Sequence, residues 1–343
     1  MKTSRKKTTI KDVALRAGVS ATTVSMVLNG KDASLPQSTR ERVRRAAAEL
    51  DYRTDFLARA MVTGRTNIVG MIIPDISNPF FAEAVRHIQV ELAGKGYDLI
   101  LCNSEERVDN DVRYLRLLAG RNVDGLIFTP SAEAFAPKNA EKLRSLLAEI
   151  GSPFLFFDRY FEGVGPHVAV DNEQSSFLAV RELLEEGHRR IGVITGPRML
   201  NSSANRLKGV RRAFSAYGLT LSDDCIYEGK YDIMTGVSGA AALLKRDVTA
   251  IFAFSDMQAY GVYETLRRAG KRIPDEISVM GFDDNLYASV LEVPLSTMRQ
   301  PVESIAKEAC RVLLERIAGT SSEPPVCFAA ELVRRASVGA PRH

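Results

Sequence analysis

Pairs of polar or turn-forming residues recur in this sequence directly after short apolar runs, and their side chains are the ones best placed to do chemistry. These pairs are Pro74-Asp75, Asp158-Arg159, Asp171-Asn172, Gly196-Pro197, Ser255-Asp256 and Asp283-Asp284. Open sheets of alternating strands and helices bind ligands at the carboxyl ends of their strands. The pairs therefore predict a ligand site at such an edge.

The motifs of common enzyme classes do not occur in the sequence. It contains no GxxxxGK[ST], HExxH, GxSxG or GxGxxG. The four histidines are His87, His167, His188 and His343. Turn packing explains His188, which lies in a Gly-His-Arg-Arg segment, better than catalysis does. We therefore expect a protein that is not an enzyme, with no metal and no cofactor.

Composition predicts a globular protein outside membranes. Of the 343 residues, 45% are hydrophobic and 26% are charged, which is ordinary for a globular protein of two or three domains. No apolar run reaches about 18 residues, and no apolar signal core follows the basic N-terminus. The four cysteines, which form no CxxC, are expected to be reduced and buried in a cytoplasmic protein. They are Cys102, Cys225, Cys310 and Cys327.

Charge is distributed unevenly along the chain. Residues 1–65 contain 14 Lys and Arg against 6 Asp and Glu, a formal charge of +8, although the whole chain carries only +4. A basic N-terminal segment on an acidic remainder indicates that the segment binds a polyanion. The alternative is a basic tail that only aids solubility, and the ordered pattern within the segment argues against it.

Three short helices are predicted between residues 10 and 50. Thr9 with Asp12 forms a capping box for the first helix, and Ser20 can cap the second. Pro36 lies where the third should begin. Residues 51–66 predict a linker with a helical tendency, too short to be helical alone in water.

From residue 67 onward, strand-like runs alternate with amphipathic helical segments. The predicted strands are Ile68–Ile73, Leu99–Cys102, Gly125–Phe128, Phe154–Phe157, Val168–Val170, Ile191–Ile194, Ala250–Phe254 and Ile277–Gly281. The predicted helices are Phe81–Gly94, Asp111–Arg121, Glu141–Ile150, Ser175–Gly187, Arg206–Tyr217, Val237–Lys245, Gln258–Ala269 and Val302–Ala318. This rhythm predicts parallel sheets covered by helices. Because the region is long for one open sheet, we expect two doubly wound subdomains with a cleft between them.

Motifs along nearly the whole chain resemble those of the lactose-repressor (LacI/GalR) family of bacterial transcription regulators. The N-terminal ones are Thr9-Ile10-Lys11-Asp12-Val13-Ala14, Ala17-Gly18-Val19-Ser20, Thr22-Thr23-Val24-Ser25 and Leu28-Asn29-Gly30. Later ones are Thr63-Gly64-Arg65-Thr66, Pro74-Asp75-Ile76-Ser77-Asn78-Pro79-Phe80-Phe81, Val170-Asp171-Asn172, Arg206-Leu207-Lys208-Gly209 and Gly281-Phe282-Asp283-Asp284.

The resemblance implies an α plus α/β fold with three parts. Residues 1–50 would form a helix-turn-helix DNA-binding head of three helices, and 51–66 a hinge helix. Residues 67–343 would form a periplasmic-binding-protein-like body of two doubly wound α/β subdomains, which binds the effector and dimerises. The N-subdomain would comprise about 67–170 plus 298–322, and the C-subdomain about 171–297 plus 323–343.

The resemblance also implies which residues contact DNA. They are Thr9, Ser20, Ala21, Thr22, Thr23, Ser25, Met26, Asn29, Ala58, Arg59 and Met61. The second helix would lie in the major groove, and Met61 would be the apolar wedge of a hinge pair in the minor groove. Alternatively, Met26 belongs to the core of the head, Thr22 and Thr23 only cap a helix, and Met61 only packs on its partner hinge.

A second set of residues is implied to bind a small-molecule effector in the cleft. It consists of Phe80, Phe81, Ser202, Arg206, Tyr231, Ser255, Asp256 and Asp283. Carboxylates accept hydroxyl hydrogens, and a guanidinium donates to neighbouring oxygens, which suits a polyhydroxylated ligand. Alternatively, Arg206 is a surface residue, Asp256 only caps the next helix, and one of the two phenylalanines is core.

The resulting prediction is a homodimeric regulator that binds a near-palindromic double-stranded operator. It is expected to repress a catabolic operon under control of a sugar or sugar derivative. The alternative effector is a purine or nucleoside that acts as a corepressor. The rival classes are a soluble sugar-binding protein, which would need a signal peptide and lack the head, and an enzyme with an accessory DNA-binding domain.

Overall fold

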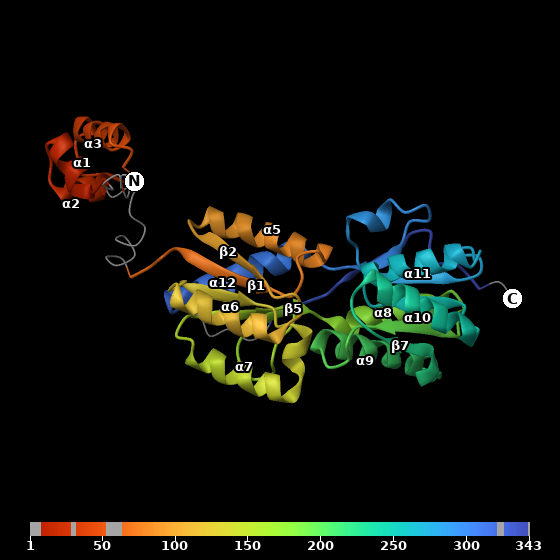
Figure 1. The fold of residues 1–343 in the computed structure, drawn as a ribbon. Helices are drawn as coiled ribbons and strands as arrows, with labels where there is room; N and C mark the ends of the chain where they lie inside the picture. The colour runs from red at the N-terminus through yellow and green to blue at the C-terminus, as the bar shows by residue number, and fades with distance from the viewer. Residues whose placement is uncertain (1–7, 29–31, 53–63, 321–325, 342–343) are drawn as a thin grey trace, which may run out of the picture. The chain divides into compact units, whose positions relative to one another are not determined.

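The apolar residues of the N-terminal segment form three helices around one small core (Figure 1). The computed structural model describes residues 8–28, 32–52, 64–320 and 326–341, and residues 1–66 form a compact unit of their own. The helices are α1 (Ile10–Ala17), α2 (Ala21–Leu28) and α3 (Gln37–Glu49). Their buried residues are Val13, Ala14, Ala17, Val24, Val27, Val43, Ala46 and Ala47.

Local capping interactions define the ends of these helices, as the sequence predicts. The Asp12 carboxylate accepts the backbone N–H of Thr9 at 2.8 Å, which completes the capping box of α1. Gly18 ends α1 in the left-handed region, with φ 64°. The Ser20 hydroxyl accepts the backbone N–H of Thr23 at 3.1 Å and so caps α2.

Residues 67–343 form the second unit, and its first sheet is entirely parallel in the part of the chain that the structure describes. Its strand order is β11 (Val326–Phe328), β5 (His167–Val170), β4 (Phe154–Phe157), β3 (Gly125–Phe128), β1 (Ile68–Ile73) and β2 (Asp98–Asn103). Its helices are α5 (Pro79–Gly94), α6 (Val108–Gly120), α7 (Pro137–Glu149) and α12 (Val302–Ala318), with the 3-10 turn η1 (Ala132–Phe135). Helices α5 and α12 share one hydrophobic core, and α6 and α7 share another on the opposite face of the sheet.

The second sheet is parallel except at one edge. Its order is β12 (Glu331–Val333), β10 (Ser296–Arg299), β9 (Ser278–Asp283), β8 (Ala250–Ala253), β6 (Ile191–Thr195) and β7 (Ile226–Glu228), with β12 antiparallel to β10. Its helices are α8 (Asn172–Glu185), α9 (Asn201–Ala216), α10 (Ile233–Leu243) and α11 (Asp256–Arg268). Short 3-10 turns are η2 (Asp223–Cys225), η3 (Leu244–Arg246) and η4 (Leu286–Ser289).

Glycines allow the helices of the second sheet to pack in close pairs. A Cβ added to Gly209 in α9 would overlap the carbonyl oxygen of Glu173 in α8. A Cβ on Gly261 in α11 would likewise overlap the carbonyl oxygen of Ile233 in α10. Only a residue without a side chain permits this approach of two backbones.

The chain passes between the two sheets three times. The first crossing follows β5, which ends at Val170, and the second follows β10, which extends in the second sheet to Arg299. The third follows Phe328, because β11 pairs in parallel with β5 in the first sheet. The expected division at about residue 322 is therefore too early. The division depends on β11, a strand of three residues that only long-range pairing stabilises, so its own sequence does not reveal it.

Three of the four cysteines are buried, but Cys327 is exposed, contrary to expectation. It lies on β11, an edge strand of the first sheet, where one side of the strand faces solvent. His188 is buried and bonds through its two ring nitrogens to the Thr249 hydroxyl and the Gly339 carbonyl, which fits the expected packing role. Among the described residues, no helix is both long and apolar enough to span a membrane.

Candidate functional site

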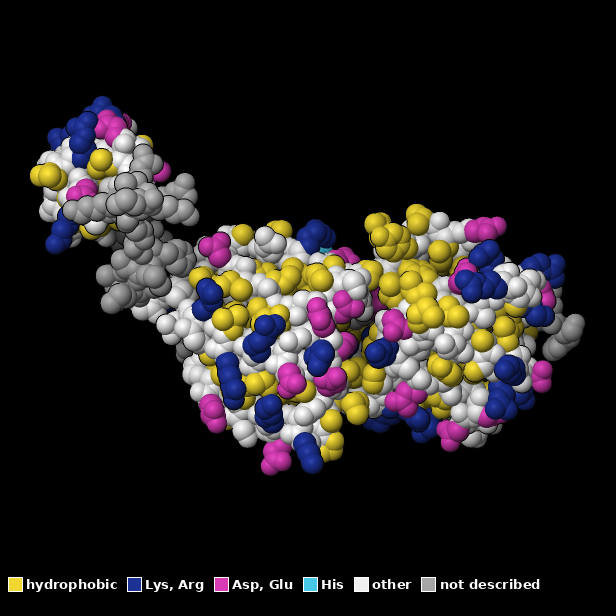
Figure 2. All heavy atoms as spheres, viewed as in Figure 1, with side chains coloured by type: hydrophobic (Ala, Val, Ile, Leu, Met, Phe, Trp, Pro, Cys, Tyr) yellow, Lys and Arg dark blue, Asp and Glu magenta, His cyan; other side chains and the backbone are white. Residues whose placement is uncertain are grey.

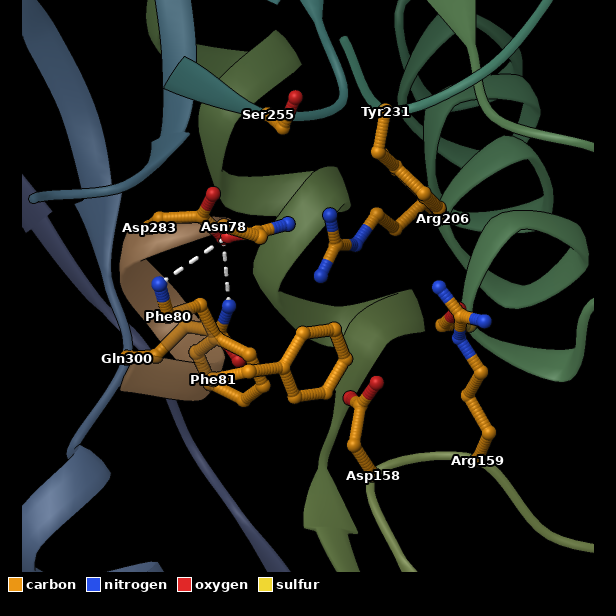
Figure 3. A pocket seen from close by; sticks show the side chains of 11 residues that line it. Asn78, Phe80, Phe81, Asp158, Arg159, Arg206, Tyr231, Ser255, Asp283 and Gln300 are labelled. Atoms are coloured by element: carbon orange, nitrogen blue, oxygen red, sulfur yellow. Dashed lines mark hydrogen bonds between the residues drawn. The ribbon is translucent and has the colours of Figure 1, made fainter. Parts of the chain in front are cut away.

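The carboxyl ends of strands from both sheets open into a shared cavity (Figure 3). Its volume is about 310 Å³, including the part that is open to solvent. It is lined by Asn78, Phe80, Phe81, Asp158, Arg159, Ser202, Arg206, Tyr231, Ser255, Asp283 and Gln300. The first five come from the start of α5 and from the loop after β4, and Gln300 comes from the second crossing segment. A cavity at this edge of two parallel sheets is where small molecules bind in such folds.

Arg206 is a buried cation of the cavity that contacts within the protein hold in place. Its side chain is buried on α9, with only 4% of the residue exposed. The Nε–H donates to Asn172 Oδ1 at 2.7 Å, and Nη1 donates to the Phe254 carbonyl oxygen. The guanidinium also lies 3.6 Å from the centroid of the Phe282 ring, in a cation–π contact. These contacts orient the group, which points toward Asp283 and Asn78 in Figure 3.

Asp283 ends β9 and points its carboxylate into the cavity. Its backbone has φ 127°, so the chain turns sharply at the strand end. The carboxylate accepts the side-chain N–H of Gln300 at 2.6 Å. Burial raises the pKa of Asp283 to about 7, although the positive charge of Arg206 opposes the shift. The Asp283 carboxyl group thus binds and releases its proton near neutral pH, and its ionised form accepts hydrogen bonds.

Asp158 and Arg159 follow β4 and bring a second pair of opposite charges. Asp158 is 7% exposed and has a left-handed backbone, with φ 64°. Burial raises its pKa, while the neighbouring Arg159 and Arg206 lower it. The guanidinium of Arg159 is 2% exposed and binds Glu106 through two N–H···O bonds of 2.9 Å each. Glu106 itself is not among the residues that line the cavity.

Aromatic rings supply the apolar walls. The side chain of Asn78 caps α5 by accepting the backbone N–H of Phe80 at 3.0 Å, which fixes the helix start that carries both phenylalanines. The rings of Phe80 and Phe81 meet edge to face at 5.1 Å between centroids. Both are buried, so each is at once a core residue and a wall of the cavity. Gly196 lies against the ring of Tyr231, where a Cβ would overlap it.

Three polar atoms on cavity residues are buried without a hydrogen-bond partner among the described residues. They are Arg159 Nε, the Tyr231 hydroxyl oxygen and Gln300 Oε1. A buried polar atom that stays unpaired costs about 1–3 kcal/mol. The first is a donor, the last is an acceptor, and the hydroxyl can be either. A ligand that pairs with all three would need both donors and acceptors.

The structure brings together seven of the eight residues that the sequence assigned to effector binding. Asp256 is the exception, because its fully buried carboxylate turns away to the Thr297 hydroxyl at 2.6 Å and the backbone N–H of Asn285 at 2.9 Å. Ser255, not Asp256, caps α11. Four lining residues were not assigned from the sequence: Asn78, Asp158, Arg159 and Gln300. Asp158 and Arg159 carried a signal as a strand-end pair, whereas Gln300 had none.

The N-terminal unit presents the residues expected to contact DNA on and around α2. Ser20 and Thr22 are exposed, and Met26 is half-buried and lies outside the small core. Thr9 is exposed; Ala21, Thr23 and Ser25 are half-buried. Val24 and Val27 point into the core instead, so the two faces of α2 differ. Asn29, Ala58, Arg59 and Met61 lie outside the described residues.

Two segments of the chain match known protein families. Residues 9–55 match the bacterial regulatory proteins of the lacI family, and residues 180–338 match a periplasmic binding protein-like domain. The HTH-type transcriptional repressor PurR of Photobacterium profundum is 34% identical over 334 residues, covering 96% of this chain and 98% of that protein. The HTH-type transcriptional regulator CelR of Thermobifida fusca is 33% identical over 330 residues, covering 93% and 95%.

Solved structures give the same fold over nearly the full length. The transcriptional regulator CelR–cellobiose complex has a TM-score of 0.72 at 31% identity and covers 96% of this chain and 100% of that one. The lac repressor dimer bound to operator and the anti-inducer ONPF has a TM-score of 0.87 at 24% identity, covering 98% and 100%. At that identity the second likeness concerns the fold alone.

Proposed function

The chain belongs to the lacI family of bacterial regulatory proteins and is a DNA-binding transcriptional regulator, not an enzyme. On this premise we propose that it represses a catabolic operon, and that binding of a sugar or sugar derivative in the cavity releases the protein from its operator. We assign a separate function to each part of the chain. Residues 1–50 read DNA, residues 51–66 form a hinge, and residues 67–343 bind the effector and dimerise.

The mixed set of polar groups in the cavity supports the sugar assignment most directly. Asp158 and Asp283 are acceptors, Arg206 is a donor, and the unpaired atoms of Arg159 and Gln300 are of opposite kinds. A hydroxyl group both donates and accepts, so a ring with several hydroxyls can pair with such a set. The aromatic walls would cover the apolar face of the same ring. CelR, a relative whose structure is a cellobiose complex, adds support.

The DNA-binding proposal places α2 in the major groove. Thr22 and Met26 would then meet base edges, because both side chains lie outside the core. The methyl groups of Ala21, Thr22 and Met26 suit contact with thymine methyls, whereas Ser20, Thr23, Ser25 and Thr9 would bind phosphates. For Asn29, Ala58, Arg59 and Met61 the proposal rests on the sequence alone.

A homodimer on a near-palindromic operator completes the proposal. Two-fold symmetry of the protein requires two half-sites in the DNA. Leu286, Tyr287 and Val290, in and beside η4, are 79%, 55% and 72% exposed. Figure 2 shows hydrophobic side chains gathered at this part of the surface. An exposed apolar cluster of this kind is typical of an interface between subunits.

The proposal is tested by screening ligands against the full-length protein. Common mono- and disaccharides and, in parallel, purine bases and nucleosides are assayed by calorimetry. Any ligand that binds is then added to the protein on an operator selected from random DNA duplexes. We expect a sugar to bind and to lower operator affinity. Binding of a purine or nucleoside alone, or stronger operator binding with ligand, would contradict the proposal.

A further inference from the structure

We infer that the cavity selects an uncharged sugar and rejects its anionic derivatives, such as sugar phosphates and uronic acids, and that Glu106 determines this selectivity. The inference rests on the proposed function, because it takes the ligand to be sugar-like. It concerns a residue outside the cavity wall that acts on a cation within the wall.

Arg159 would by itself be an anion-binding group, and Glu106 removes that capacity. Both terminal nitrogens of the guanidinium donate to the two carboxylate oxygens of Glu106 at 2.9 Å, the parallel geometry by which arginine also binds phosphates and carboxylates. Nη1 additionally donates to the Pro130 carbonyl oxygen at 3.3 Å. These three bonds leave two of its five N–H groups, the Nε–H, which has no partner among the described residues, and one N–H of Nη2. With the charge of the guanidinium balanced by Glu106, these N–H groups suit neutral oxygens.

Glu106 is itself held in place for this task. Its Oε2 also accepts the backbone N–H of Ala132 at 2.6 Å. The side chain is therefore tied to the loop after β3 as well as to the loop after β4. Because the pair is nearly buried on the arginine side, where the side chain is 3% exposed, solvent screens it little.

Arg206 is also engaged within the protein, which leaves fewer of its N–H groups for an anion. Its Nε and Nη1 are used by Asn172 and by the Phe254 carbonyl, and one face of the group lies on Phe282. The backbone N–H of Asp256 at the start of α11, another potential anion donor, already bonds to the Asp283 carboxylate. Each anion-binding feature near the cavity thus has an internal partner.

The charge balance of the cavity points the same way. With Arg159 and Glu106 cancelling, the positive charge of Arg206 faces the carboxylates of Asp158 and Asp283. Burial is the largest cause that raises the pKa of both carboxyls, and the positive charge of Arg206 lowers the pKa of each. When both are ionised, their two negative charges exceed the single positive charge of Arg206. An anionic ligand would add to this excess, whereas a neutral sugar adds no charge.

Calorimetry with the full-length protein tests the inference in two arms. The first compares each neutral sugar that binds with its uronic acid and its 6-phosphate. The second uses sulfate alone, which needs no knowledge of the effector. Wild-type protein is expected to bind the neutral sugar at least tenfold more tightly than either derivative. Titration with sulfate is expected to show no saturable binding.

Glu106→Gln keeps the shape of the side chain and frees the charge of Arg159. We expect it to raise the affinity for the anionic derivatives, relative to the neutral sugar, at least tenfold and to create saturable sulfate binding. Glu105→Gln is the matched control, because it removes the same charge from the exposed neighbouring position. The double variant Glu106→Gln/Arg159→Gln should lose the gain.

Several outcomes would overturn the inference. One is a wild-type preference for an anionic derivative, and another is saturable sulfate binding that Arg159→Gln abolishes. A folded Glu106→Gln protein with unchanged selectivity would also do so. If no sugar binds the wild-type protein, the proposed function fails, and the sulfate arm still decides the charge selectivity by itself.

Discussion

Individual residues show where sequence reasoning about the cavity succeeds and where it stops. Arg206 and Asp283 lie in motifs that the sequence displays, and both reach the cavity. Asp256 sits equally at a strand end, yet its carboxylate turns to Thr297, because an unpaired buried charge is costlier than an internal bond. Gln300 has no local signal, since its place depends on which segments cross between the sheets.

Arg206→Ala and Asp283→Ala should each weaken effector binding. Each removes a charge-assisted hydrogen bond, which is worth about 1.5–3 kcal/mol. This corresponds to a roughly tenfold to 150-fold loss of affinity. Calorimetry with the identified sugar measures the loss. Arg212→Ala is the control on the same helix, because Arg212 is exposed and pairs at the surface with Glu173. Equal losses in the control and in Arg206→Ala would refute the assignment.

Asp283 also predicts how stability depends on pH. Its pKa rises from 3.8 to about 7 on burial, so the folded state binds more protons than the unfolded state between these values. The contribution of Asp283 to stability therefore falls as the pH rises from about 4 to 7. Asp283→Asn should raise the Tm of the ligand-free protein at pH 8 and raise it less at pH 5. Thermal unfolding at both pH values measures the change in Tm, and Glu105→Gln is the control for the loss of one negative charge. A larger increase in Tm at pH 5 than at pH 8 would contradict a buried Asp283 that binds a proton.

Elements with local signals are the ones that the sequence predicts best. The start of α5 is set by the Asn78 cap and by Pro79 in the first turn, and the central strands are set by continuous apolar runs. The short strands β7, β10 and β11 have three or four residues and were not predicted. Such strands depend on long-range pairing rather than on their own sequence. The sequence therefore reveals the strands that form continuous apolar runs and misses these three, of which β7 and β11 lie at sheet edges and β10 lies between β12 and β9.

The close packing of α8 and α9 positions the Arg206 side chain, and Gly209 permits it. Gly209→Ala would force a methyl group into the backbone of α8 at Glu173 and within 3.0 Å of the Phe177 nitrogen. We expect a loss of about 1–3 kcal/mol in stability, as for other overpacked sites. Effector affinity should also fall, because the bond from Arg206 to Asn172 spans the two helices.

Denaturant unfolding and calorimetry measure the two effects of Gly209→Ala. Ser215→Ala, at an exposed position of the same helix, is the control and should change neither quantity. A Gly209→Ala protein as stable as wild type would show that the helices can separate at no cost and that their spacing does not position Arg206.

At the scale of the molecule, the change of hydrophobic period near residue 66 coincides with the boundary between the two compact units. The uneven distribution of charge follows the same boundary, because the basic residues 1–65 belong to the unit that contains α2. Three segments cross between the sheets of the second unit, and the middle one carries Gln300 to Asp283. A ligand that bonds to both halves of the cavity changes operator affinity only if it binds one arrangement of these halves more tightly than another.

The central claim is that a ligand in this cavity controls DNA binding, and operator affinity measured with and without the identified sugar tests it most directly. Fluorescence anisotropy of a labelled operator duplex at one salt concentration gives the Kd for wild-type and Arg206→Ala proteins. We predict that saturating sugar weakens wild-type binding at least tenfold. The variant should bind the operator like ligand-free wild type, within about twofold, and should not respond to the same sugar concentration. A variant that responds to the sugar like the wild-type protein would contradict the account, because the effector would then act from another site.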